Sequence, residues 1–367
     1  MPQLVYTAAT SLLTLTEEQF ACGMGEVIKH GLIMDADYYE WLQAHRKEIL
    51  ARDLSVCEQM ILVSCRVKRD VVEQDPMLGQ DTWEDAESLL QKEVIQKLLF
   101  KSNLSKEDIR YIFAGDLLGQ LIATTFGILD FEIPFFGLYG ACSTIGEALS
   151  IAAITVDGEN AENVIAIASS HFASAERQFR FPLAYGNQRP YAATWTVTGA
   201  GAVVVSKNKG FAKITGITTG IIVDYGVKDA QNMGACMAPA AADTLYRHFK
   251  DFNTTPEDYD KIITGDLGIV GKTILMDLLR EKGYDISKKH MDCGVEMFDG
   301  SSQDTHAGGS GCGCAATILT SYIFKQLKKK VWKKILFVPT GALMSPVSFN
   351  EGNSVPGIAH LVQIEAD

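Results

Sequence analysis

The chain has 367 residues, of which 47% are apolar, and a formal net charge of −12 at pH 7. This length allows two or three domains with sizeable cores, and the acidic excess argues against nucleic-acid binding, which needs clustered lysines and arginines. Eight cysteines without paired CxxC spacing are typical of reduced thiols, not of a disulfide framework or a zinc ribbon. The chain has no run of about 18 uninterrupted apolar residues. We therefore expect a cytoplasmic protein.

The first 75 residues are predicted to be helical. A capping box spans Thr16 to Gln19, and apolar residues at helical spacing follow it through His45. A second helical stretch is predicted from about Ile49 to Val72. The Pro- and Gly-containing segment 74–80 reads as a turn, so we place a domain boundary after residue 75.

Beyond this boundary, helical segments alternate with short β-branched runs, which predicts a mixed or parallel sheet covered by helices. Residues 105–117 (SKEDIRYIFAGDL) are nearly repeated as residues 255–267 (TPEDYDKIITGDL), 150 residues later. A second pair of similar runs begins at Val164 and Ile335. The two pairs predict a duplicated α/β fold with a ligand site where the copies meet. The expected halves are residues 76–230 and 231–367.

Cys142 lies between a predicted strand and a predicted helix, in the segment Gly-Ala-Cys-Ser-Thr. Unpaired N–H groups at a helix N-terminus lower the pKa of a nearby thiol and favour the thiolate. Such a thiol is typical of an acyl-accepting nucleophile. The alternative is a small apolar residue packed beneath a Gly-rich turn, and the spacing alone supports both interpretations equally.

Two parts of the chain resemble two different families. Residues 4–75 resemble the start of the helical domain of 3-dehydroquinate synthase, through TLTEEQFACGMGEVIKHGLIMDADYYEWL and SCRVKRDVVEQD. Residues 76–367 resemble the thiolase-like stage V sporulation protein AD family, through words such as GACST, SSHFASAERQFRFP, QNMGACMAPAAADT, HAGGSGCGCA and TGALMSP. The resemblances imply an all-α fragment followed by a thiolase-like, duplicated α-β-α-β-α layered fold. The segment that supplies the family's first strand is replaced here by the synthase-like piece, so we expect an incomplete, less stable first half.

The synthase resemblance implies a metal ligand at Glu26 and substrate-binding lysines at Lys29 and Lys68. In that family, zinc also needs two histidines from a later stretch, and this chain leaves the family pattern before reaching them. The nucleotide-binding half of the synthase is missing as well. Because a catalytic zinc site requires three protein ligands, we expect an inactive fragment that binds neither zinc nor NAD. A chain that carries the synthase's name without its activity is one alternative for its function.

The thiolase-like resemblance places Cys142 at the position of the family's nucleophile. Condensing enzymes of this fold add a His, together with a second His, an Asn or a Cys, from the second half. At these two places the chain has Asp266 and the segment Gly308–Gly311, and His306 nearby is expected at the surface. An ionised Asp266 beside Cys142 would raise the thiol pKa and oppose attack. We therefore predict a binding protein, with an acyltransferase that uses Cys142 as the alternative.

The predicted ligand site draws on loops of both halves. Successive glycines can present backbone N–H groups to an anion, and His171 follows a predicted buried strand, where sheets of this class place ligand groups. For His171 a satisfied core histidine is an equal alternative, and for Asp292 a local helix cap. The predicted site consists of Cys142, His171, Asp266, Asp292, Cys293, Gly309 and Ser310.

The family resemblance implies a function in spore formation. It implies binding of dipicolinic acid, with or without calcium, by a soluble subunit docked on a multi-subunit membrane channel that moves this acid into the developing spore. We accordingly expect a cytoplasmic protein, peripheral to the forespore or spore inner membrane, that needs no cofactor. A purely structural subunit is a further alternative. Thiolase-like proteins usually pair through their sheets, so a homodimer is expected by analogy.

Overall fold

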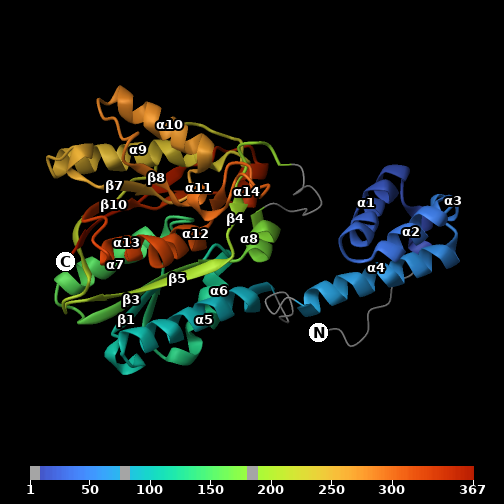
Figure 1. Cartoon of the computed structure of the whole chain (residues 1–367), viewed down its shortest axis with the longest axis horizontal. Coiled ribbons are helices and arrows are strands. Elements are labelled where there is room, and N and C mark those ends of the chain that lie inside the picture. Colours follow the sequence, from blue (N-terminus) through green and yellow to red (C-terminus); the bar gives the residue numbers. More distant parts are fainter. Residues whose placement is uncertain (1–8, 75–82, 180–188) are drawn as a thin grey trace. The chain divides into compact units, whose positions relative to one another are not determined.

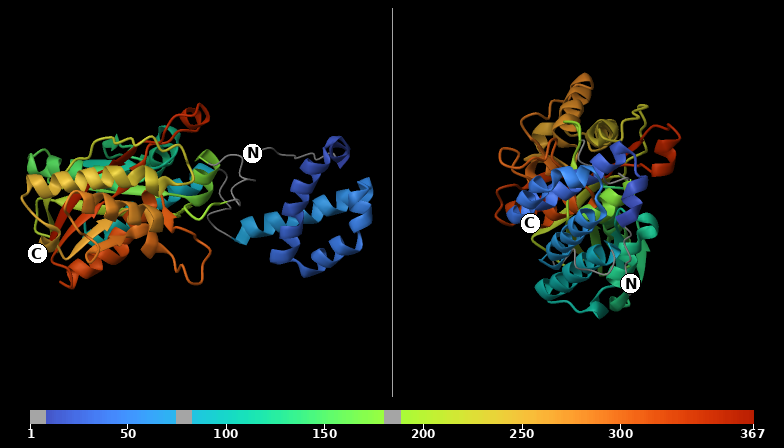
Figure 2. Two further views of the ribbon diagram at one scale, coloured as in Figure 1. Left: turned by 90° about the horizontal axis from the view of Figure 1, so that it is seen from above. Right: turned by 90° about the vertical axis from the view of Figure 1, so that its right-hand side faces the viewer.

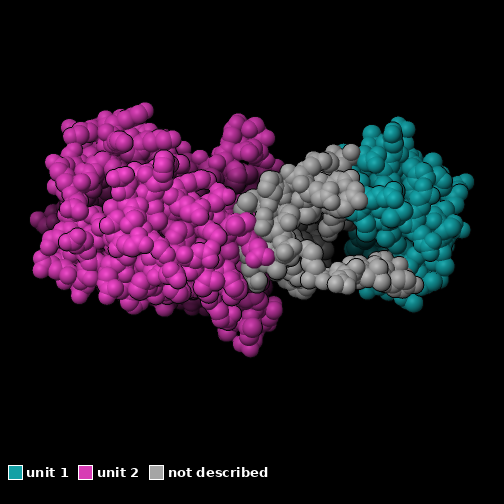
Figure 3. All heavy atoms as spheres, turned by 90° about the horizontal axis from the view of Figure 1, so that it is seen from below, with its two compact units in different colours: residues 1–82 teal, residues 83–367 magenta. Residues whose placement is uncertain are grey.

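The chain folds into two compact units, residues 1–82 and 83–367 (Figure 3). The computed structural model in Figure 1 describes residues 9–74, 83–179 and 189–367. The domain boundary predicted after residue 75 falls in the interval 75–82 and lies outside the described residues. Among the helices in the described ranges, none is both long and apolar enough to cross a lipid bilayer.

The first unit is helical wherever it is described. Its elements are η1 (Ala9–Thr14), α1 (Glu17–Met34), α2 (Ala36–Ala44), α3 (Arg46–Leu50) and α4 (Leu54–Gln74). The predicted capping box is present, because Gln19 N donates to Thr16 Oγ1 at 3.2 Å and Thr16 N donates to Gln19 Oε1 at 3.1 Å. The Tyr38 hydroxyl donates to the Met60 carbonyl at 2.8 Å and so ties α2 to α4 inside a small apolar core.

Two sheets form the framework of the second unit. In spatial order, the first contains β2 (Phe135–Gly137), β1 (Tyr111–Gly115), β3 (Asn163–Ser170) and β5 (Gly199–Ser206). The second contains β6 (Ala212–Thr218), β13 (Leu361–Ala366), β10 (Lys334–Val338), β7 (Lys261–Thr264) and β8 (His290–Asp292). Both sheets are mixed, because one pairing in the first and two in the second are antiparallel.

Helices form three layers around these sheets (Figures 1 and 2). One outer layer holds α5 (Trp83–Ser102) and α6 (Ile122–Ile128), and the other holds α9 (Met233–Asp251) and α10 (Gly268–Glu281). Between the sheets lie α7 (Thr144–Asp157), α12 (Cys312–Ile318) and α13 (Phe324–Lys328). Shorter elements are α8 (Phe172–Phe179), α11 (Cys293–Met297), α14 (Pro346–Asn350), β4 (Trp195–Thr196), β9 (Gly309–Ser310), β11 (Thr340–Ala342) and β12 (Gly357–Ala359). The predicted α-β-α-β-α layering is confirmed.

The two sheets repeat the same strand pairings in the same register, as the sequence repeats predicted. The strand pairs β1–β7, β2–β8, β3–β10 and β5–β13 are equivalent. The matching residue pairs of the first and second sheets are Tyr111–Val164 and Lys261–Ile335, Val164–Val205 and Ile335–Ile364, and Ile112–Phe135 and Ile262–His290. The similar runs at Val164 and Ile335 therefore mark equivalent strands.

The sheets differ in one strand. In the second sheet β6 lies beyond β13 and pairs with it in antiparallel fashion. In the first sheet β5 is the last strand, and no described residue forms a strand beyond it. Within the described residues the first sheet therefore has one strand fewer than the second, as predicted from the missing opening segment, and β6 belongs to the second sheet although the expected boundary placed residues 212–218 in the first half.

The two halves interlock. Strand β4 of the first half pairs with β9 of the second, and α12 of the second half packs against β5. The approach is close: a Cβ atom at Gly201 would lie 2.2 Å from the carbonyl oxygen of Ala316, and one at Gly313 would lie 2.3 Å from the carbonyl oxygen of Gly199. Only glycine fits at these two positions, so the packing of α12 on β5 depends on them.

The expected homodimer would use the other edge of the first sheet. Strand β2 is the edge strand there and all three of its residues are exposed, Phe136 by 54%. Phe126 and Leu129, which are near in sequence, are exposed by 53% and 63%.

We expect Phe136→Asp to convert a dimer to a monomer, because it places a charge on a sheet edge that would pair with its own copy. Light scattering after gel filtration measures the mass, with Ile222→Asp, a loop residue, as the control. A wild-type mass of one chain would refute the dimer.

Candidate functional site

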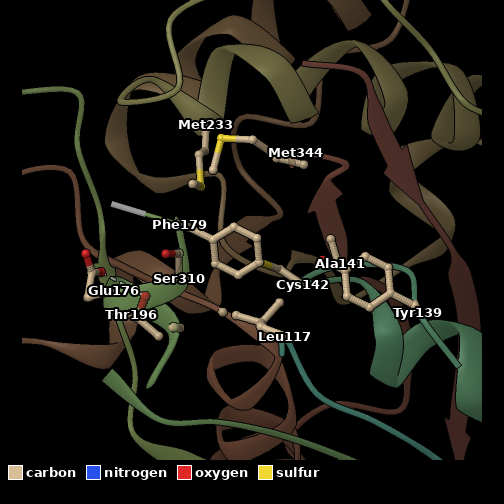
Figure 4. A pocket seen from close by; sticks show the side chains of 13 residues that line it. Leu117, Tyr139, Ala141, Cys142, Glu176, Phe179, Thr196, Met233, Ser310 and Met344 are labelled. Carbon is tan, nitrogen blue, oxygen red and sulfur yellow. Dashed lines mark hydrogen bonds between the residues drawn. The ribbon is translucent and has the colours of Figure 1, made fainter. Parts of the chain in front are cut away.

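A pocket lies where the two halves meet (Figure 4), with about 430 Å³ of space free of atoms, part of which is open solvent. Most of its wall is apolar, and the polar residues Glu176, Thr196 and Ser310 lie together on one side in Figure 4. The lining comprises Leu117, Tyr139, Ala141, Cys142, Ala175, Glu176, Phe179, Thr196, Met233, Ser310, Gly311, Ala342 and Met344. The ligand site predicted at the junction of the copies thus coincides with a pocket.

Cys142 reaches this pocket from a strained turn between β2 and α7. The preceding Ala141 has φ +48°, a left-handed conformation that costs energy for a residue with a side chain. Two hydroxyls hold the turn, since Ser143 Oγ donates to the Gly140 carbonyl at 2.6 Å and Thr144 Oγ1 donates to the Ala141 carbonyl at 2.7 Å. The turn therefore places the Cys142 thiol just ahead of α7, as the sequence predicted.

Asp266, which follows β7, lies against this thiol. Its carboxylate accepts hydrogen bonds from Thr340 Oγ1 at 2.9 Å, from Gly311 N at 3.0 Å and from the Cys142 thiol. Complete burial outweighs these bonds and raises the pKa of Asp266 to about 7. Burial, followed by the charge of Asp266, raises the pKa of Cys142 well above its ordinary value. The sequence predicted two opposing effects on the pKa of Cys142, a lowering by the helix N-terminus and a raising by Asp266. Burial adds to the effect of Asp266, and together they outweigh the helix N-terminus, so the thiol is protonated at neutral pH.

The pocket offers this thiol no imidazole, because none of the thirteen described lining residues is a histidine or an asparagine. His306 lies on a loop, where Nδ1 contacts the Pro190 carbonyl at 3.0 Å and Nε2 contacts Asp304 at 3.1 Å. His171 is buried at the end of β3 but does not line the pocket. Its carbonyl accepts a hydrogen bond from Ala175 N at 3.0 Å, at the start of α8.

Asp292 and Cys293 lie beside the pocket and not in its wall. The Asp292 carboxylate accepts hydrogen bonds from the backbone N–H groups of Leu267, Gly268 and Val295 at 3.0, 3.0 and 3.1 Å. Asp292 therefore caps α11, which was the alternative interpretation of this residue, and its carboxylate also fixes the loop that carries Asp266. Cys293 is completely buried in the central core.

The glycine segment before α12 is less open to an anion than the sequence suggested. Gly308 N donates to the Thr305 carbonyl at 2.9 Å, and Gly311 N donates to Asp266. Gly309 pairs with Trp195 between β9 and β4 and does not line the pocket, whereas Ser310 does. Of the predicted site residues, Cys142 and Ser310 line the pocket and Asp266 bonds to the Cys142 thiol, whereas the others lie outside the wall.

Several lining residues were not predicted from the sequence. Glu176 is 5% exposed and accepts a hydrogen bond from Thr196 Oγ1 at 2.9 Å. Together with Phe179 it comes from α8, directly after β3, and Met233 and Met344 come from the second half. A usable signal was present, because positions 175, 176 and 179 share one face of a helix that begins at the end of a buried strand.

The synthase-like residues are spread over the first unit. Lys29 is an exposed residue of α1. Glu26 belongs to α1 and Lys68 to α4, and both side chains lie outside the described part of the structure. Across the ranges that are described, no cluster of three or more His, Cys, Asp or Glu side chains is suited to hold a metal ion. The described residues therefore do not fit a zinc site.

The family model of stage V sporulation protein AD (SpoVAD) matches residues 62–365. The chain belongs to the stage V sporulation protein AD family. The SpoVAD protein of Bacillus subtilis (strain 168) is 46% identical over 287 residues, which cover 78% of this chain and 85% of that protein. The resemblance of residues 76–367 to this family is confirmed.

A second family model, the C-terminal part of 3-dehydroquinate synthase, matches residues 23–86. The synthase of Nitrosomonas europaea is 42% identical over 74 residues, which are 20% of this chain and 20% of that enzyme. The resemblance of residues 4–75 to 3-dehydroquinate synthase is confirmed as well. The chain spans about one-fifth of the length of the synthases it matches.

Solved structures with the same layered fold are distant in sequence. An OleA variant of Xanthomonas campestris bound with cerulenin has a TM-score of 0.51 and 13% identity, over 76% of this chain and 79% of that one. The Acat5 thiolase of Ascaris suum in complex with coenzyme A has a TM-score of 0.50 and 13% identity, over 77% and 94%. These likenesses confirm the thiolase-like fold of this SpoVAD family member.

Proposed function

We propose that this SpoVAD family member is a non-catalytic binding protein of spore formation, and that it takes up dipicolinic acid in the pocket beside Cys142. The observation that carries the proposal is a pocket that keeps the nucleophile position of its fold but places an acid, Asp266, against the thiol in place of a base. The Cys142 thiol is protonated and donates to Asp266. Such a pocket can bind a small ligand without the proton transfers that acyl transfer requires.

The chemistry of the wall favours the calcium complex of this acid over its free dianion. Dipicolinate is a flat ring with two carboxylates, and Phe179, Met233 and Met344 offer it an apolar seat. Among the described lining residues none is positively charged and Glu176 is acidic, so these side chains give a dianion no counter-charge. Calcium neutralises it and binds oxygen ligands, which Glu176, Thr196 and Ser310 are placed to supply.

Isothermal titration tests this proposal with three titrants: dipicolinate with calcium, dipicolinate with a chelator, and calcium chloride alone. We expect heat of binding from the first, at least about tenfold weaker binding from the second, and none from the third, because two like charges stay unneutralised without the metal. A folded protein that gives no heat with any titrant would refute the binding function. Equal affinity with and without calcium would refute the calcium form alone.

The variant Glu176→Gln keeps the size of the side chain and removes its charge. We expect it to weaken binding of the calcium complex by about tenfold or more, because a charged oxygen ligand is lost. Glu159→Gln is the matched control, since Glu159 is exposed and pairs with Lys207 at the far end of β3 and β5. Equal losses in both variants would contradict a role for Glu176 at the ligand.

Family membership also supports docking on the cytoplasmic face of a spore membrane channel, as a peripheral subunit. We propose in addition that the synthase-like unit is inactive, because the described residues offer no zinc site. Zinc-dependent conversion of the synthase substrate by the purified chain would contradict this.

A further inference from the structure

The outer edge of β5 has no strand beside it among the described residues, whereas the equivalent edge in the second sheet is covered by β6. Strand β5 pairs with β3 on one side only, and no backbone hydrogen bond joins its other edge to any described residue. An antiparallel strand directs half of its N–H and C=O groups away from its partner, so the outward groups of β5 have no backbone partner within the described part of the chain. In the second sheet, the equivalent edge of β13 is paired with β6 over its whole length.

The equivalence of the two edges extends into the helices that flank them. Asn103 and Asn253, 150 residues apart, both have positive φ, 54° and 50°, just after α5 and α9. Leu104 N donates to the Leu99 carbonyl at 3.1 Å, and the equivalent bond in the second half is 3.0 Å long. Each residue near the C-terminal end of α5 can therefore be matched to the residue of α9 that lies 150 positions later.

In the second half, a polar network holds β6 in its place. His248 of α9 contacts Thr218 of β6 at 2.9 Å and the Tyr259 hydroxyl at 3.1 Å. That hydroxyl donates to Gln363 of β13 at 3.2 Å, and Gln363 donates to Thr215 of β6 at 2.8 Å. The seat of β6 is therefore polar on the side that faces α9.

The equivalent seat beside β5 is apolar. The residues that match His248, Tyr259 and Gln363 are Leu98, Ile109 and Val204, and all three belong to the core cluster beneath α5. On the other face of β5, Val203 and Val205 pack against the central core. A strand added at this edge would thus meet apolar side chains on both of its faces.

We infer that the outer edge of β5 is an acceptor site for an extended, apolar polypeptide strand supplied by another chain, bound antiparallel to β5 as β6 is to β13. The occupant must be extended, because only a strand pairs with a row of backbone groups. It must carry apolar residues where β6 carries Thr218, because Leu98 offers no hydrogen bond in place of His248. This inference goes beyond the proposed ligand function and does not depend on it.

Three peptides that copy residues 211–219 of the chain serve as probes. The first carries Gly216→Val and Thr218→Leu, which suit the apolar seat. The glycine in β6 is needed only because a Cβ there would lie 2.7 Å from the Phe252 ring, and the residue that matches Phe252 is Ser102. The second peptide is unmodified, and the third adds Ile217→Pro to the first to remove a backbone donor.

Hydrogen exchange of residues 199–206 in the full chain is the readout. With the first peptide at roughly ten times its Kd, we expect about tenfold slower exchange of these amides. The unmodified peptide should bind about tenfold more weakly, since its threonine hydroxyl is buried without a partner. The proline peptide should give no protection.

Three results would overturn the inference. The first is absence of protection by the first peptide at its solubility limit, and the second is equal protection by the proline peptide. The third is protection of residues 199–206 that is already present without peptide and vanishes on dilution. That outcome would assign the edge to a second copy of this chain.

Discussion

Raising the pH from 6 to 9 is expected to lower the free energy of unfolding of residues 83–367 by about 3 kcal/mol through Glu87 alone. Burial, together with the charge of Asp116, raises the pKa of Glu87 from 4.5 to about 8. The folded state therefore keeps a proton that the unfolded chain releases. Stability from this group is present at low pH and is lost between pH 4.5 and about 8.

Glu87 lies in a buried chain of hydroxyl and amide hydrogen bonds. Its carboxyl accepts hydrogen bonds from Ser169 Oγ at 2.9 Å and Ser174 Oγ at 2.8 Å. Gln91 bridges Ser169 to Thr124, at 2.8 and 2.9 Å, and Thr124 bonds to Asp116. None of these partners is positively charged, so ionisation of Glu87 stays unfavourable in the folded state.

The variant Glu87→Gln isolates this effect, because glutamine retains an acceptor for Ser169 and cannot ionise. Urea denaturation at pH 6 and pH 9 should show wild type and variant close together at pH 6 and the variant more stable at pH 9, by about 3 kcal/mol. Glu93→Gln on the same helix is the control, since Glu93 is exposed and pairs with Lys97. Equal pH dependence in wild type and Glu87→Gln would show that Glu87 is not the group that holds the proton.

Cys142 is expected to stay unacylated when the protein is incubated with radiolabelled acyl-CoA. Its pKa is raised by burial and by Asp266, and each unit of increase lowers the thiolate fraction at neutral pH by about tenfold. Cys22 and Cys65 are exposed and serve as internal references. Mass spectrometry after a timed N-ethylmaleimide reaction should find Cys142 modified more than tenfold more slowly than these two cysteines.

Removing the charge next to the thiol separates the two causes of its raised pKa. Asp266→Asn should speed alkylation of Cys142 relative to Cys22, because the carboxylate no longer opposes the thiolate. Unchanged alkylation would assign the whole effect to burial. Stable acyl label on wild-type Cys142 would support the alternative acyltransferase function and count against the binding protein that we propose.

The sequence was sufficient to predict the architecture because the repeated segments 105–117 and 255–267 mark the two copies of the fold. The Gly-Asp-Leu words after two equivalent strands, at Asp116 and Asp266, identified both copies, and the missing strand followed from the family resemblance. Cys142 and Asp266 were placed together because the thiolase-like resemblance assigns both to the site. The repeated segments and these motifs are local in the sequence, so packing does not override them.

The rest of the pocket could not be read from the sequence, since it depends on how the halves interlock. Whether the Gly308–Gly311 amides face a ligand or a carboxylate is decided by the approach of Asp266 from another loop. Asp292 was ambiguous because a cap and a ligand contact use the same carboxylate. Glu176 and Phe179 were overlooked because their helix, α8, places them in the wall only once the second half is in position.

The close fit of α12 against Gly199 and Gly201 also limits where this gene can be cut and rejoined. A crossover between β5 and β6 would leave each product without the surface that the other half supplies. A crossover ahead of Trp83 divides none of the described cores, but it removes the strand that would lie beside β5. The two family matches overlap over residues 62–86, so the two ancestries join within that interval at the expense of one strand.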